Sequence, residues 1–187
     1  QGTMRAMELL ADRGYETIVF HAVGNGGRAM EQLMKEGYIT AVLDYALGDI
    51  TDALFGGLRA ADENRLTVAG KLGLPQVVVP GGVDHIGILL SEPNTVPDEY
   101  KDRLYSYHNP VILVPRTTGP ELVRMMEEIR DRLKDAKTNT VFMLPTKGIS
   151  SYSVDGGVLY DAERDTAFHQ AVREMLPDYL PLVEVGA

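Results

Sequence analysis

The chain has 187 residues, no cysteine and a formal net charge of −9 at pH 7. Its length suits one domain with a full hydrophobic core, and a chain without cysteine has no disulfides, thiolate metal sites or cysteine nucleophiles. The acidic charge and the scattered lysines and arginines argue against nucleic acid as a partner. No apolar stretch approaches the roughly 20 residues that span a bilayer, and no signal peptide is visible. We therefore expect a cytoplasmic protein without membrane contact.

The first half of the sequence alternates helical and extended patterns. In chain order we expect a helix, a strand, a helix, a strand, two helices and a strand, at 4–13, 16–23, 28–36, 39–43, 49–55, 62–72 and 75–79. Gly14, Gly37 and Gly73 follow three of the helices directly, as C-terminal capping glycines do. Consecutive apolar residues at 75–79 predict a strand that is buried on both faces.

The second half continues this alternation after a segment of weak pattern at 80–109. The expected elements are a strand, a helix, a strand, a small hairpin, a helix and a strand, at 111–114, 118–135, 140–144, 152–160, 161–176 and 182–185. Six strands that alternate with helices predict an α/β fold over residues 1–187, a Rossmann-like three-layer domain with a mainly parallel sheet. Because the sequence opens inside a helix, without the strand that normally precedes it, we expect this domain to be the C-terminal half of a two-domain protein.

The sequence at 24–28, Gly-Asn-Gly-Gly-Arg, predicts a strand–loop–helix junction. Gly24, Gly26 and Gly27 allow positive φ and close approach of a ligand, and the helix N-terminus behind them presents unpaired N–H groups. A phosphate or carboxylate suits this place, with Asn25 and Arg28 beside it. The alternative interpretation is a tight turn whose glycines only allow close packing.

Other candidate residues follow the remaining strands, because ligands of such sheets bind outside the carboxyl ends of the strands. After 75–79, Asp84 could accept a ribose hydroxyl or hold Mg²⁺, and His85 could contact phosphate or carry a proton. Arg116 and Lys147 could each neutralise an anion. Capping, turn formation or a solvated loop are the alternatives for these residues. The full set in these loops is Gly81, Gly82, Asp84, His85, Arg116, Thr117, Thr118, Lys147, Gly148 and Ser150.

Three further histidines lie outside these loops. His108 lies just before a strand, and it is a second candidate for acid–base chemistry. We expect His21 to be packed in the core and His169 to face solvent. No histidine and carboxylate spacing typical of zinc is present, and we predict no metal bound by the protein itself.

Several segments together resemble the Tm-one-like ATP-binding domain family, which includes uncharacterised bacterial relatives of the tomato mosaic virus resistance protein. The matching segments are 13–31, Leu74–Gly81 with Asp84, Tyr107-His-Asn-Pro110, Arg116-Thr-Thr118, and Leu144-Pro145 with Gly148 and Ser150. The resemblance implies the second of two Rossmann-like halves, ATP binding and self-association into a homo-oligomer. This chain has Asn25 where the family usually has Thr and Gly82 where it often has Cys, so a hydroxyl and a thiol are missing.

These observations predict a domain that binds a nucleotide, ATP with Mg²⁺, or another small phosphorylated ligand. One alternative is an enzyme, a transferase, epimerase or hydrolase, that acts on a phosphorylated or sugar-nucleotide substrate with His85 or His108 as acid–base. Another is a protein-interaction module that nucleotide stabilises. The sequence leaves open whether the protein catalyses a reaction.

Overall fold

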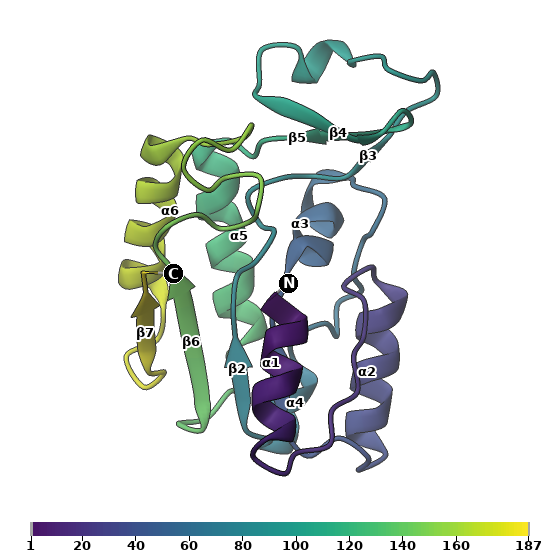
Figure 1. The fold of residues 1–187 in the computed structure, drawn as a ribbon. Coiled ribbons are helices and arrows are strands. Elements are labelled where there is room, and N and C mark those ends of the chain that lie inside the picture. The colour runs from purple at the N-terminus through teal and green to yellow at the C-terminus, as the bar shows by residue number, and fades with distance from the viewer. Residues whose placement is uncertain (1, 187) are drawn as a thin grey trace.

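Two sheets organise the fold of residues 2–186, which a computed structural model describes (Figure 1). The parallel sheet has the order β1–β2–β6–β7, with strands Val42–Asp44, Gln76–Val78, Thr140–Pro145 and Leu182–Val185. A second, antiparallel sheet has the order β3–β5–β4, with strands Ile88–Leu89, Ile112–Pro115 and Tyr105–Asn109. Figure 1 shows this antiparallel sheet above the carboxyl ends of the parallel strands. The predicted α/β class with a mainly parallel sheet is confirmed.

Six α-helices are described, and each lies where the sequence pattern predicts a helix. They are α1 Gly2–Ala11, α2 Asn25–Lys35, α3 Gly48–Phe55, α4 Val68–Leu72, α5 Gly119–Arg132 and α6 Ala162–Met175, with a 3₁₀ turn at Asp98–Tyr100. The helix predicted over 62–72 is shorter than expected, since residues 63–67 form turns before α4. α5 begins with a capping box in which Thr118 and Glu121 satisfy each other's backbone N–H groups.

The main core lies on one face of the parallel sheet. Strand order equals chain order, and right-handed crossovers therefore place the helices between these strands on the same side. Val78, Phe142 and Leu144 are buried there against α5 and α6. The alternate side chains face the opposite side, where Leu43 is 41% and Val183 is 42% exposed.

Two predicted strands are corrected by the structure. Residues 16–23 form no strand, because they pair with no neighbour; Glu16–Ala22 donate no backbone hydrogen bond within residues 2–186. The β-propensity of a residue reflects how well its side chain fits a paired, half-buried surface. A run of β-prone residues therefore forms a strand only where a neighbouring strand pairs with it. The strand at 111–114 exists as β5, but it belongs to the antiparallel sheet, because the weakly patterned segment before it supplies β3 and β4 as partners.

The hairpin predicted at 152–160 is also wrong. This segment is a series of turns, in which Leu159 N donates to Tyr152 O at 2.9 Å and Gly157 N to Val154 O at 2.7 Å. Leu159 is fully buried, so the segment folds inward around this side chain and does not extend as a ladder.

Candidate functional site

Asp84 is the centre of a buried polar network at the carboxyl end of β2. Its carboxylate accepts a hydrogen bond from Ser150 Oγ at 2.6 Å and lies 3.1 Å from His85 Nδ1. Arg116 Nη1 lies 3.2 Å from the same carboxylate. Burial raises the pKa of Asp84, but His85, Ser150 and Arg116 together outweigh burial and lower it, so the carboxylate stays ionised. The network thus joins the loops that follow β2, β5 and β6.

Arg116 is fully buried and is held by two carboxylates. Besides Asp84, its Nη2 pairs with Asp165 on α6. Burial raises the pKa of Asp165, and the adjacent guanidinium only partly offsets this effect. Thr117 is buried too, and its N and Oγ1 donate to carbonyls in the segment after β2 at 3.0 and 3.3 Å. Arg116 and Thr117 therefore bond to the protein itself, and Arg116 offers no open face to a phosphate.

The network orients His85. Its ring packs edge-on against Tyr152 with 5.4 Å between centroids, while Nδ1 faces Asp84. Nε2 makes no hydrogen bond to the described residues and is not among their buried unpartnered atoms, so it reaches the surface. With Asp84 at Nδ1, the neutral ring carries its proton there and leaves Nε2 as an acceptor, whereas the protonated ring donates from both nitrogens.

Because Gly82 has no side chain, it leaves space for about one methyl group between the His85 ring and the start of α3, and we name this space the opening. A Cβ placed on Gly82, whose φ is +77°, would lie 3.7 Å from His85 Cε1 and 3.8 Å from Gly48 N. α3 begins at Gly48 without a side-chain cap, and the amides of Gly48 and Asp49 donate to none of the described residues. Leu47 N donates to Gly81 O at 2.8 Å, which holds the glycine loop against the start of the helix.

Arg59 stands beside the same helix N-terminus. Its Nε and Nη2 donate to Asp52 at 2.7 and 3.0 Å. Its Nη1 would lie 3.4 Å from a Cβ on Gly48 and donates to none of the described residues. Arg59 is therefore a fixed cation with one free donor at the rim of the opening.

The Gly24–Gly27 loop lies next to Arg59 and is closely packed. A Cβ on Gly24 would lie 2.5 Å from Ala60 O, and one on Gly26 would lie 1.9 Å from His21 O. Packing alone therefore requires these glycines. Gly24 is the N-cap of α2 and supplies no side-chain cap, and the amides of Gly26 and Gly27 donate to no described backbone carbonyl. An anionic ligand at this loop would bind these two unpaired amides.

A second buried ionic cluster supports the start of α2. Arg65 pairs with Asp44, and its Nε donates to Asp49 Oδ2 at 2.9 Å. A Cβ on Gly27 would lie 2.8 Å from Arg65 Cδ, so α2 rests directly on this arginine. Glu31 of α2 accepts from Leu66 N at 2.7 Å, and burial raises its pKa from 4.5 to about 7.

Several predicted residues lie away from the opening. His108 is exposed on β4, at the end of the β4–β5 hairpin opposite Arg116, so the fold does not bring it to Asp84. Lys147 is exposed. Gly148, at φ +116°, is required by the turn, because a Cβ there would lie 2.8 Å from Val154 Cα. Asn25 and Arg28 are exposed and hydrogen-bond to each other.

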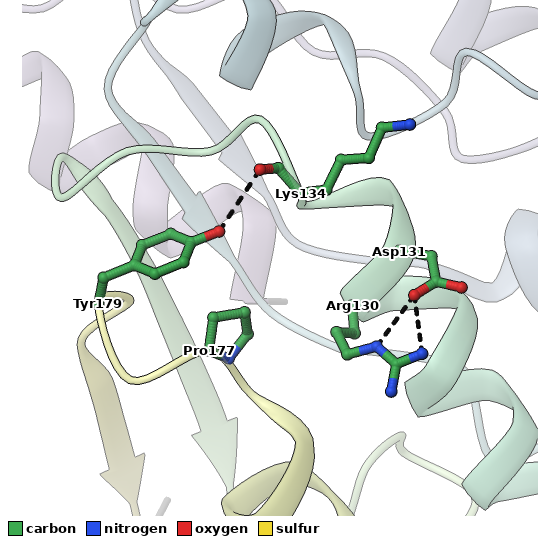
Figure 2. Close-up of a pocket in the computed structure, with 5 residues that line it drawn as sticks. All are labelled: Arg130, Asp131, Lys134, Pro177 and Tyr179. Atoms are coloured by element: carbon green, nitrogen blue, oxygen red, sulfur yellow. Dashed lines mark hydrogen bonds and ion pairs between the residues drawn. The ribbon is translucent and has the colours of Figure 1, made fainter.

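The expectations for two further histidines are wrong. His21 is exposed, because the segment that carries it is not a strand. His169 is buried at 8% exposure, and burial lowers its pKa. A separate shallow hollow of about 440 Å³ lies near the C-terminal end of α5 (Figure 2). Figure 2 shows Tyr179 hydrogen-bonded to Lys134 O and Arg130 paired with Asp131 there, and no predicted site residue lines it.

Comparison with known proteins identifies the family. The model described as "Uncharacterised protein family (UPF0261) C-terminal domain" matches residues 1–187. The chain belongs to the UPF0261 family. A UPF0261 protein of Clostridium tetani is 39% identical over 187 residues, which are 100% of this chain and 46% of the relative. A UPF0261 protein of Mesorhizobium japonicum is 35% identical over 162 residues, covering 87% of this chain and 40% of the relative.

The tomato ToMV resistance protein Tm-1(GCR237) is also similar to this UPF0261 domain. It is 33% identical over 169 residues, which are 90% of this chain and 22% of the tomato protein. The resemblance seen in the sequence is therefore confirmed as a family relationship, while ATP binding stays a prediction. The chain spans less than half the length of each of these relatives. Among residues 2–186 of the UPF0261 domain, none of the helices combines the length and apolar character that crossing a bilayer requires.

Sequence reasoning missed the residues that complete the site of this UPF0261 domain. Asp52 and Asp165 lie inside helices, and Arg59 lies in a helix–helix loop that follows no strand directly, so their partners are visible only in the fold. The sequence could have revealed the role of Gly48, since a helix that begins with glycine and has no capping side chain leaves its first amides unpaired.

Glu31 gives this UPF0261 domain a testable pH dependence. Its pKa is raised from 4.5 to about 7, so folding favours the protonated form. The associated stability is fully present below pH 4.5 and is lost as pH rises to about 7, a loss on the order of 3 kcal/mol. We expect Glu31→Gln to remove this decline in urea unfolding measured from pH 5 to 8. Glu36→Gln, at an exposed position of the same helix region, should keep it; equal pH profiles for both variants would refute the assignment.

Proposed function

We propose that this domain binds a phosphate-bearing small molecule at the carboxyl edge of its parallel sheet. The observation that carries the proposal is the meeting of three features beside Gly82, namely the His85 ring, the uncapped start of α3 and the free Nη1 of Arg59. Helix N-termini with free amides bind anions well, and the free Nη1 of Arg59 adds a further N–H donor. An anionic group fits the donors that converge there.

The same edge supports an elongated ligand such as a nucleotide. Gly24 packs against the Arg59–Ala60 backbone, so the open amides of α2 lie close to the opening at α3. A phosphate chain could contact both helix starts, and ATP is the nucleotide that the sequence resemblance implies. Among residues 2–186 no group of three or more histidines or carboxylates is arranged to hold a metal. Mg²⁺ in this proposal therefore enters on the phosphates.

Binding is tested by thermal shift and calorimetry with inorganic phosphate, AMP and ATP, with and without Mg²⁺. A ligand at 100 times its Kd stabilises the fold by about 2.7 kcal/mol, which gives a measurable shift in Tm. We expect His85→Asn to weaken binding of the responding ligand about tenfold or more, since it keeps an N–H toward Asp84 and removes Nε2.

The matched control is His108→Asn, because His108 is exposed on β4 away from the opening. It should bind like the unaltered protein. Equal affinities for all three proteins, or no response to any phosphate compound, would overturn the proposal.

Catalysis is the second candidate function, and the Asp84–His85 contact favours it. A carboxylate at Nδ1 orients the ring and leaves Nε2 to face a substrate, which is the arrangement of a general acid–base. Here the substrate would be phosphorylated or a sugar nucleotide. If His85→Asn abolishes turnover of a substrate that it still binds, the enzyme assignment is the better one.

A further inference from the structure

One face of the parallel sheet is covered by little of the described chain. We name it the open sheet face: it comprises the side chains opposite the main core, namely Leu43, Val77, Val141, Met143 and Val183. All five are apolar, none is fully buried, and Leu43 and Val183 are 41% and 42% exposed. Figure 1 shows β6 and β7 in full view on this side, with no helix in front of them.

An uncovered apolar face is unusual in this architecture. Parallel sheets are normally covered on both faces, because their crossovers place helices there. In this chain the strand order equals the chain order, so the crossovers between described strands all reach the opposite face. The open sheet face therefore lacks the cover that crossover helices normally provide.

The start of the chain lies on the same side and is itself short of contacts. α1 lies toward the viewer in Figure 1, in front of α4, and it packs extensively against none of the other described elements. None of its residues is buried, and Met4 is 62% exposed. A helix of this length is marginal in water without tertiary packing.

The segment that follows α1 is also short of packing and hydrogen-bond contacts. Ile18 and Val19 are 57% and 53% exposed, in a run that the sequence predicts to be a strand. Their amides, like those of Glu16–Ala22 as a whole, find no acceptor in the part of the chain that the structure describes. A β-prone segment with free backbone groups is a template for pairing with another strand.

We propose that the open sheet face, α1 and residues 16–22 form the interface for the N-terminal portion of a longer chain. The matched family unit is a C-terminal domain, and the relatives are more than twice as long as the segment they share with this chain. The elements that lack contacts, α1 and residues 16–22, are those to which an N-terminal portion would be joined. A tethered portion meets this surface at a high effective concentration, which favours it over a separate partner.

Hydrogen exchange on the longer chain tests this interface without any substitution. Amides 16–22 should exchange at least about a hundredfold slower than an unprotected backbone. Residues 2–186 offer them no acceptor, so protection must come from polypeptide outside these residues, whether a tethered portion or a second copy. Unprotected exchange in this segment would overturn the proposal.

Two substitutions test the side chains. In the longer chain we expect Ile18→Glu and Val183→Glu each to lower Tm by about 5 °C or more. Leu89→Glu, at a residue 67% exposed on the antiparallel sheet, should change Tm by less than about 2 °C. Three equally small shifts would refute the assignment of the interface.

The oligomeric state separates a tethered portion from a second copy. Protection and the Tm effects should persist when dilution dissociates any oligomer, with light scattering used to follow the molar mass. If they appear only in a dimer and vanish when dilution dissociates it, the surface binds a second copy and the proposal fails. None of these measurements involves a phosphate ligand, so their failure leaves the ligand proposal untouched.

Discussion

Replacing Arg116 with methionine is expected to destabilise the domain by about 3–5 kcal/mol, the range for breaking a buried ion pair from one side. The guanidinium is fully buried between Asp84 and Asp165, so its loss leaves two carboxylates without their shared cation. Methionine fills a similar volume, and the cost is therefore electrostatic more than steric. Urea unfolding at pH 7 measures the effect.

The matched control for this prediction is Arg124→Met on α5. Arg124 is 53% exposed and pairs with Glu127 and Glu128 at the surface. Surface pairs of this kind contribute at most about 1 kcal/mol, and the control should unfold almost like the unaltered protein. A loss below about 1 kcal/mol for Arg116→Met would show that the network is not the buried, closed arrangement described above.

Acid should partly rescue Arg116→Met, and this provides a second check. Burial already raises the pKa of Asp165, and removal of the neighbouring guanidinium raises it further. A protonated Asp165 needs no cation. The difference in stability between the variant and the unaltered protein should therefore shrink as pH falls from 7 to 5.

The helices were predictable because their end points are encoded locally. Gly14, Gly37 and Gly73 all have positive φ, and each donates its N–H to a carbonyl of the helix that it ends. Thr118 caps α5 through a residue only three positions away. Contacts at such short separation follow from the order of the residues alone.

The strands were harder to predict because a strand exists only with its neighbour. The segment at 16–23 has the composition of a strand and lacks a partner, whereas β5 found partners in the segment at 80–109 that carried almost no pattern. The sheet to which β5 belongs could not be read from its own four residues.

In the candidate site, the sequence predicted which loops meet, but not which side chains are buried between them. The loops after β2 and β6 were correctly placed at one edge of the sheet, and Asp84, His85 and Ser150 meet there. The burial of Arg116 depends on Asp165, which is 49 positions away along the chain, and on the antiparallel sheet above it. Nothing near Arg116 in the sequence distinguishes a buried structural cation from an open ligand-binding one.

Gly26→Ala is expected to destabilise the ligand-free domain by about 3 kcal/mol or more, as overpacking against a fixed backbone does. The added Cβ would lie 1.9 Å from His21 O and 2.9 Å from His21 C, so the turn before α2 must open to accept it. The higher helix propensity of alanine offsets only about 1 kcal/mol of that cost. Urea unfolding without added ligand measures the balance.

Gly119→Ala is the matched control, because no atom lies within 4 Å of a Cβ at this first residue of α5. It should leave stability unchanged or raise it by less than about 1 kcal/mol. A large loss at Gly26 in ligand-free protein shows that packing alone requires this glycine, so a ligand at α2 must rely on the backbone amides. If Gly26→Ala is as stable as its control and instead weakens phosphate binding, the turn is looser than described and the glycine is retained for the ligand.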